Sequence, residues 1–80
     1  MIIHAHKVDF AAAEQFEWAT ALVRSDDRAN YGELREVATG FIGVRLHVLV
    51  FTRRGDDIRI ISLRKATRSE TRRYVEETDK

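Results

Sequence analysis

Acidic and basic side chains that could act on a phosphate group are spaced along the second half of the chain. Glu33 and Arg35 lie two residues apart in a segment that reads as a strand, so both fall on one face of that strand. Arg59 lies on a later apolar segment, with Arg64 and Lys65 at or beyond its end. If these segments are neighbouring strands, the groups converge on one face of a sheet. A solvent-side ion pair between Glu33 and Arg35 is the alternative, and spacing alone favours it.

This set of residues fits the cleavage of RNA, because the ribose 2′-hydroxyl is an internal nucleophile. The protein need only orient that hydroxyl, remove its proton, neutralise the pentavalent phosphorane and protonate the leaving 5′-oxygen. Guanidinium groups suit the neutralisation, since a planar two-armed donor matches phosphate oxygens. A carboxylate or an imidazole suits the two proton transfers. The sequence has no P-loop, GxGxxG motif or nucleophile elbow, so we expect no cofactor.

Aromatic and histidine side chains offer fewer candidates. Tyr31 lies in a polar loop, where it could stack on a base, whereas we expect Trp18 in the core. His4 and His6 near the N-terminus form no metal-binding motif with His47. We therefore expect no metal ion, and we interpret His47 as a half-buried strand residue.

The positive charge of the chain is concentrated near its C-terminal end. The net charge is only +1, but residues 53–73 carry eight Lys/Arg against three Asp/Glu. Arg59, Lys65, Arg68 and Arg72 belong to this segment, and we expect them to contact RNA together with Tyr31. Such a patch attracts polyanions. A merely solvated charged face is the alternative interpretation.

Length and composition predict one domain over residues 1–80. The chain has no cysteine, so it has neither disulfides nor cysteine metal sites. Hydrophobic residues make up 44% and charged residues 34%, which excludes a disordered or a membrane-embedded chain. No stretch has the layout of a signal peptide or a transmembrane helix, so we expect a cytoplasmic protein.

The elements that must position these residues form a small α+β fold. Asp9 is a good N-cap for a helix to about Trp18, and Thr67 with Glu70 forms a capping box for a C-terminal helix that has Tyr74 and Val75 as its apolar contacts. Tight turns at Ile42-Gly43 and at Arg53-Arg54-Gly55-Asp56 make the connections short, which favours an antiparallel meander of three strands plus one short strand. The predicted strands are 20–24, 33–41, 44–52 and 57–63.

The ordered set of short motifs resembles the BrnT-type toxins of bacterial toxin–antitoxin pairs, over about four-fifths of the chain. The matching pieces are His6 with Val8-x-Phe10, Gly32-Glu33-x-Arg35, Phe51-Thr52-x-x-Gly55, Ile60-Ile61-Ser62-x-Arg64-x-Ala66 and Arg68-x-Glu70-x-x-x-Tyr74. No single piece is diagnostic, but their order and spacing are fairly specific.

The resemblance implies a RelE-like fold and a metal-independent endoribonuclease that arrests translation. It also implies a BrnA-type antitoxin as the partner. This ribbon-helix-helix protein neutralises the toxin, and the toxin reaches operator DNA only through it. The catalytic positions of the family fall here on His6, Glu33, Arg35 and Arg64, whose roles as base, acid and phosphate clamp stay open.

The N-terminus departs from the family pattern. Residues 1–5 replace a whole first strand and helix, and Lys7 stands where glycine is usual. Ile2 and Ile3 could rebuild a short strand, a second copy or the antitoxin could cover the exposed sheet edge, or the chain could be an inactive relative. A reading frame that starts further upstream is another explanation.

Two other functions compete with RNA cleavage. An inactive relative would still bind the antitoxin or nucleic acid. Direct DNA binding through the basic C-terminal helix ranks below both, because the sequence has no helix-turn-helix pair.

Overall fold

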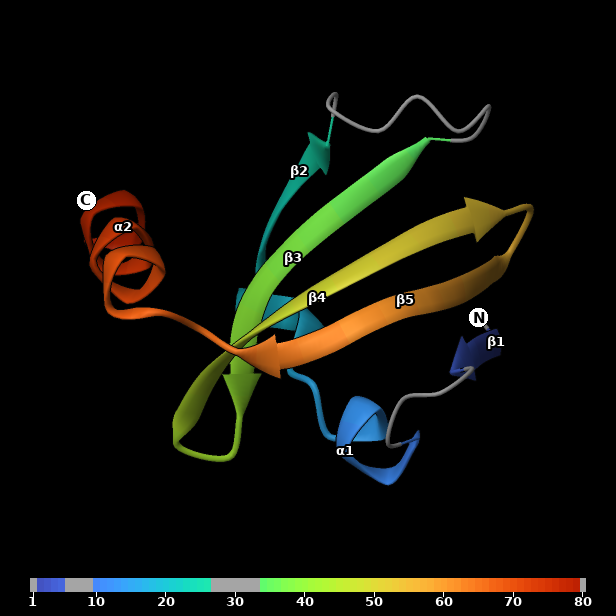
Figure 1. Cartoon of the computed structure of the whole chain (residues 1–80), viewed down its shortest axis with the longest axis horizontal. Helices are drawn as coiled ribbons and strands as arrows, with labels where there is room; N and C mark the ends of the chain where they lie inside the picture. The colour runs from blue at the N-terminus through green and yellow to red at the C-terminus, as the bar shows by residue number, and fades with distance from the viewer. Residues whose placement is uncertain (1, 6–9, 27–33, 80) are drawn as a thin grey trace.

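The computed structural model describes residues 2–5, 10–26 and 34–79. Five strands form one sheet in the order β1-β5-β4-β3-β2, and two helices flank it (Figure 1). The α+β prediction is confirmed. The elements in chain order are β1 (Ile2–Ala5), α1 (Phe10–Glu14), the 3-10 turn η1 (Trp18–Thr20), β2 (Leu22–Asp26), β3 (Arg35–Ile42), β4 (Arg45–Arg54), β5 (Asp57–Lys65) and α2 (Arg68–Thr78).

Strands β2 to β5 form the predicted antiparallel meander. Two tight turns connect β3 to β4 and β4 to β5. Gly43 and Gly55 occupy them with φ angles of +61° and +59°. Glycine adopts this left-handed backbone without steric penalty, so both turns form where the sequence places them.

β1 adds a strand that runs parallel to β5, with Ile3 opposite Ile58 and Ala5 opposite Ile60. The interpretation in which Ile2 and Ile3 rebuild a short strand is thereby confirmed. β1 and β2 are the outer strands of the sheet. The dimer expected through an exposed sheet edge stays a prediction.

The N-terminal helix is shorter than the sequence suggests. α1 ends at Glu14 rather than near Trp18, and the following strand begins at Leu22. The backbone leaves the helix to pair with the end of β3: Phe16 forms a bridge with Ile42, and the amide of Glu17 donates to the carbonyl of Phe41 at 2.9 Å. This long-range pairing overrides the helix propensity of the alanine run. The proposed N-cap, Asp9, lies outside the described residues.

The core lies on one face of the sheet, under α1 and η1. Phe51 and Leu49 are fully buried at its centre. The Trp18 ring packs edge-on against Phe16 and Phe51, at centroid distances of 4.9 and 5.2 Å, so its predicted place in the core is confirmed. The buried cluster consists of Ala13, Phe16, Ala38, Leu49, Phe51, Ile58 and Ile60.

α2 begins where the sequence predicts. The Thr67 hydroxyl accepts from the Glu70 amide at 3.1 Å, and the Glu70 carboxylate accepts from the Thr67 amide at 2.8 Å. Tyr74 anchors the helix through its ring, which packs edge-on against Phe41 of β3, and through its hydroxyl, which donates to the Thr20 carbonyl at 2.8 Å. Val75, the second expected apolar contact, is 54% exposed, so Tyr74 is the main anchor. Neither helix of the described residues is long and apolar enough to cross a membrane.

Candidate functional site

The face of the sheet opposite the core carries a row of polar residues. Arg35 on β3, Thr52 on β4 and Arg59 on β5 lie directly opposite one another in the strand register. Residues paired in this way share a face, and Thr52 alternates with the core residue Phe51 along β4. The row therefore lies on the face away from α1. Arg35 and Arg59 are two strands apart, which separates their backbones by about 10 Å.

A β-bulge brings Arg64 to the same face. Phe51 faces Ile60 across the ladder, but the next residue, Val50, faces Ser62, so Ile61 is the extra residue. Without this insertion Arg59 and Arg64, five positions apart, would lie on opposite faces. With it, Arg59 pairs with Thr52 and Arg64 with Val48, which share one face of β4.

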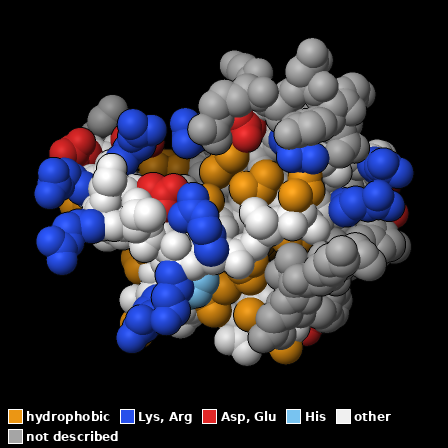
Figure 2. Space-filling model, in the orientation of Figure 1, with side chains coloured by type: hydrophobic (Ala, Val, Ile, Leu, Met, Phe, Trp, Pro, Cys, Tyr) orange, Lys and Arg blue, Asp and Glu red, His pale blue; other side chains and the backbone are white. Residues whose placement is uncertain are grey.

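We call this surface the basic face and define it by Arg24, Arg35, Arg59 and Arg64. Arg24 joins it from β2, where it lies opposite Val37. In Figures 1 and 2 the basic face is turned toward the viewer, with η1 behind the sheet. Figure 2 shows hydrophobic side chains in the middle of this view and Lys and Arg side chains around them. A phosphodiester with apolar base surfaces fits such a lining better than a purely charged ligand does.

Thr52 is the buried polar residue of the row. Its side chain is 1% exposed, and its Oγ1 has no hydrogen-bond partner within the part of the chain that the structure describes. A buried hydroxyl in this state lowers stability by about 1–3 kcal/mol. In the strand register this hydroxyl lies between Arg35 and Arg59.

Arg64 is held by a carboxylate from α2. Its Nη1 and Nη2 donate to the two Glu70 oxygens at 2.7 and 2.8 Å. The hydrogen bond from Arg64 is the main reason that the pKa of Glu70 falls from 4.5 to about 2, and the Thr67 amide lowers it further, against an opposing effect of burial. The same hydrogen bond raises the pKa of Arg64. Glu70 is therefore ionised at neutral pH, and the ion pair persists there.

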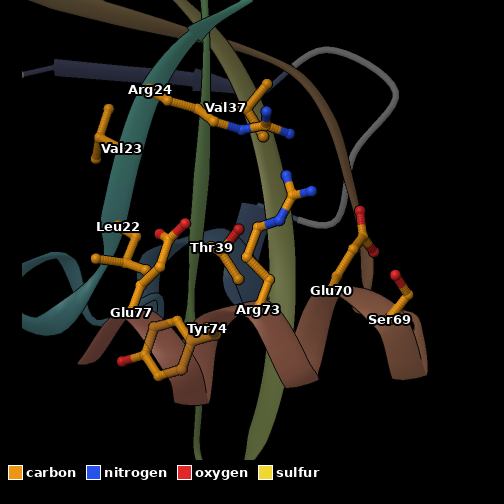
Figure 3. A pocket seen from close by; sticks show the side chains of 10 residues that line it. All are labelled: Leu22, Val23, Arg24, Val37, Thr39, Ser69, Glu70, Arg73, Tyr74 and Glu77. Carbon is orange, nitrogen blue, oxygen red and sulfur yellow. The ribbon is translucent and has the colours of Figure 1, made fainter. Parts of the chain in front are cut away.

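A cleft of about 420 Å³ separates α2 from β2 and β3. Its floor includes Val37 and Tyr74, and Glu70 lies at its side. Figure 3 shows the Arg24 and Arg73 side chains reaching from opposite walls toward one another. The cleft opens beside the basic face, so Arg73 adds a cation from the helix to those of the sheet.

The structure brings together three of the residues that the sequence singles out, namely Arg35, Arg59 and Arg64. Lys65 lies opposite His47 in the register and so points to the other face of the sheet. His47 is half-buried on β4, as expected. The remaining candidates fall into two groups: Arg68 and Arg72 are exposed on α2, and His6, Tyr31 and Glu33 lie outside the described residues.

The sequence interpretation missed Arg24, Thr52 and Arg73. The helical spacing of α2 predicts the position of Arg73, because Arg73 lies three residues after Glu70 and so on the same side of the helix. Its neighbour Arg72 falls on the outer side. Alternation along β4 could have placed Thr52 on the non-core face. Arg24 could not have been found, since its position depends on the pairing of β2 with β3.

Arg53 is a cation of a different kind. It pairs with Glu36 at 2.7 Å, and its guanidinium lies over the Phe51 ring at 5.5 Å from the centroid, on the core side of the sheet. This arginine supports the fold, and the charge count alone does not separate it from those of the basic face. Among residues 2–5, 10–26 and 34–79, no group of three or more His, Asp or Glu side chains could hold a metal ion.

Comparison with known families identifies one match. A family model described as "Ribonuclease toxin, BrnT, of type II toxin-antitoxin system" matches residues 2–70. The match includes the whole sheet and ends in the first turn of α2, at Glu70. A search of curated proteins finds no match.

Proposed function

Because the chain belongs to the BrnT family of ribonuclease toxins of type II toxin–antitoxin systems, we propose that it is a metal-independent endoribonuclease that binds RNA on its basic face. The observation that carries this proposal is the convergence of Arg35, Arg59 and Arg64 on one face of the sheet. Three guanidinium groups on an open surface supply the positive charge that a divalent ion supplies in other nucleases.

The chemistry follows from the substrate. The ribose 2′-oxygen attacks the adjacent phosphorus, the 5′-oxygen leaves, and a 2′,3′-cyclic phosphate forms. Arg35 and Arg59 hold the phosphate, and Arg64 stabilises the charge that develops on the phosphorane. His6 and Glu33, the positions implied by the family pattern, take the proton from the 2′-hydroxyl and deliver one to the leaving oxygen.

Thr52 adds a neutral donor to the same site. Its hydroxyl lies between Arg35 and Arg59 in the register, and it is buried without a partner in the described part of the chain. A phosphate oxygen bound by the two arginines accepts a hydrogen bond from Thr52 Oγ1. The substrate then satisfies a group that the free protein leaves unsatisfied.

The toxin acts in the cytoplasm, where cleavage of RNA arrests translation. Its partner is a BrnA-type ribbon-helix-helix antitoxin, which neutralises the toxin and brings it to operator DNA. The alternative from the sequence, an inactive relative that only binds the antitoxin or nucleic acid, predicts the same partner but no cleavage.

The test is induction of the chain in a bacterial host with and without the adjacent antitoxin gene. We expect growth arrest and loss of RNA integrity on induction, and recovery when the antitoxin is co-expressed. Arg35→Ala should abolish the arrest at equal protein level, with Arg45→Ala, which removes an exposed cation outside the basic face, as the control. If induction of the wild-type chain is harmless and cellular RNA stays intact, the ribonuclease hypothesis is refuted. The hypothesis of an inactive relative that only binds its partner then remains.

A further inference from the structure

The contact between Arg64 and Glu70 links the basic face to the start of α2. Both nitrogens at the end of the guanidinium donate to Glu70, at 2.7 and 2.8 Å. Such an end-on contact leaves the Nε–Nη2 edge as the second fork of the guanidinium. The Arg64 side chain is 52% exposed, so a ligand can approach it.

Glu70 is itself fixed at its other end. Its Oε1 accepts from the Thr67 amide at 2.8 Å, and its own amide donates to the Thr67 hydroxyl at 3.1 Å. The carboxylate therefore takes part in the capping box and in the ion pair at once. The ion pair therefore ties the flexible Arg64 side chain, near the end of β5, to the first turn of α2.

We propose that Glu70 is a positioning residue for RNA cleavage, which holds the Arg64 guanidinium with one fork on α2 and the other turned toward the scissile phosphate. The inference rests on the proposed function, because it assigns Glu70 a role through Arg64. A long arginine side chain otherwise loses rotamer entropy when it binds a phosphate. Prior restraint by Glu70 removes part of that loss before the substrate arrives.

Capping alone is the competing role of Glu70. In that case the carboxylate stabilises α2, and its contact with Arg64 is incidental. The two roles can be separated because Thr67→Ala removes the other half of the capping box and leaves the Arg64–Glu70 contact in place. The Thr67 amide, which donates to Glu70, is backbone and survives this substitution.

The experiment is a set of kinetic measurements on purified variants with a short RNA. We expect Glu70→Ala to lower kcat roughly 10- to 100-fold with a smaller change in KM. Glu70→Gln keeps a single acceptor oxygen and turns an NH2 group toward its other contacts, so it should fall between Glu70→Ala and the wild type. Thr67→Ala should keep kcat within about threefold of the wild type, although it loses cap stability. Unfolding in urea, measured on each variant, checks that all are folded.

A second background tests whether Glu70 acts through Arg64. Arg64→Lys keeps the charge but loses the two-armed contact, so Glu70→Ala should have a much smaller effect on kcat there than in the wild type. Equal fold-losses in both backgrounds, or a loss in Thr67→Ala as large as in Glu70→Ala, would overturn the positioning role. A wild-type protein that leaves RNA intact refutes the proposed function first, before any variant is compared.

Discussion

Thr52 is a buried polar residue on the sheet face that we propose binds RNA. It sits on the most buried strand of the sheet with its hydroxyl unsatisfied in the described part of the chain. Valine has nearly the same shape and suits a strand better. The sequence therefore keeps a polar group where packing alone favours an apolar one.

Thr52→Val should separate stability from activity. Removal of the unsatisfied hydroxyl should raise the free energy of unfolding by about 1 kcal/mol, as measured by urea denaturation. RNA cleavage should fall at the same time, because a phosphate between Arg35 and Arg59 loses a donor. Thr71→Val, on α2 outside the lining of the cleft, is the matched control and should leave cleavage unchanged. Full cleavage activity of Thr52→Val would show that the Thr52 hydroxyl has no role in RNA cleavage.

Glu70 predicts a specific response to acid. Its pKa of about 2 in the folded chain lies below the ordinary 4.5, so the folded state holds this proton less tightly than the unfolded state. The stabilisation is therefore complete above about pH 4.5 and is lost as the pH falls toward 2. We expect it to amount to roughly 1 kcal/mol, since solvent screens the pair.

Glu70→Gln provides the measurement for this response. The difference in unfolding free energy between wild type and variant should be largest near neutral pH and should shrink as the pH falls below about 4.5. Glu77→Gln, one of the other carboxylates at the cleft, serves as the control for general acid effects. A difference that stays constant down to about pH 2 would contradict the strong Arg64–Glu70 contact.

At the scale of elements, the bulge in β5 decides which cations act together. The sequence Ile58-Arg59-Ile60-Ile61-Ser62-Leu63 breaks simple alternation at Ile61, and the break was readable. The sequence alone does not show that this break forms a β-bulge, because the position of a bulge depends on the partner strand. Phe51 pairs with Ile60 and Leu49 pairs with Leu63, so the core fixes the shift that puts Arg64 on the same face as Arg59.

The rest of the fold also separates into features that adjacent residues determine and features that distant partners determine. Local signals predicted the turns at Gly43 and Gly55 and the capping box of α2, because each depends on a few adjacent residues. They did not predict the early end of α1, which follows from the pairing of Phe16 with Ile42. The parallel pairing of β1 with β5 likewise depends on a distant partner.

Two adjacent arginines on α2 test the cleft. Arg73 lines it and Arg72 does not, although both are exposed and carry the same charge. Arg73→Ala should weaken RNA binding about 5- to 10-fold, as expected for a lost phosphate contact, while Arg72→Ala should change it less. Fluorescence anisotropy with a labelled RNA at fixed salt measures both. Equal effects would assign RNA to the outer side of α2 instead of the cleft.

Gly40 on β3 controls how closely α1 and the Phe16 segment approach the sheet. A Cβ at this position would lie 2.7 Å from Cζ of Phe16, which is itself buried. Gly40→Ala should therefore destabilise the fold by about 1–3 kcal/mol. Phe16→Leu in the same chain should recover part of that loss, which thermal unfolding can measure. An unchanged melting temperature for Gly40→Ala would show that the segment can move away freely.

At the scale of the whole molecule, the two faces of the sheet differ in composition. One face carries the buried cluster under α1 and η1, and the other carries the arginines of the basic face, flanked by α2. The net charge of +1 conceals the basic face, because residues 1–50 carry seven Asp/Glu against five Lys/Arg and so offset the cations that follow. Charge counting along the sequence located the cationic segment but could not tell Arg53, which packs on the core side, from Arg59.

The family match gives the same division a functional reason. It runs from residue 2 to residue 70 and so includes Arg24, Arg35, Arg59, Arg64 and Glu70, while Arg73 lies beyond it. The sheet and the Arg64–Glu70 contact thus belong to the matched part. The remainder of α2 adds the second wall of the cleft.

The most direct test of the account is cleavage of an RNA oligonucleotide by the purified chain in excess EDTA. Wild-type protein should cleave under these conditions and produce 2′,3′-cyclic phosphate ends. Arg59→Ala should slow cleavage roughly 100-fold, and Arg45→Ala, which removes an exposed cation outside the basic face, should remain within about threefold of the wild type. Cleavage that stops in EDTA, or an Arg59→Ala variant that cuts as fast as the wild type, would contradict the claim that the basic face performs metal-independent cleavage.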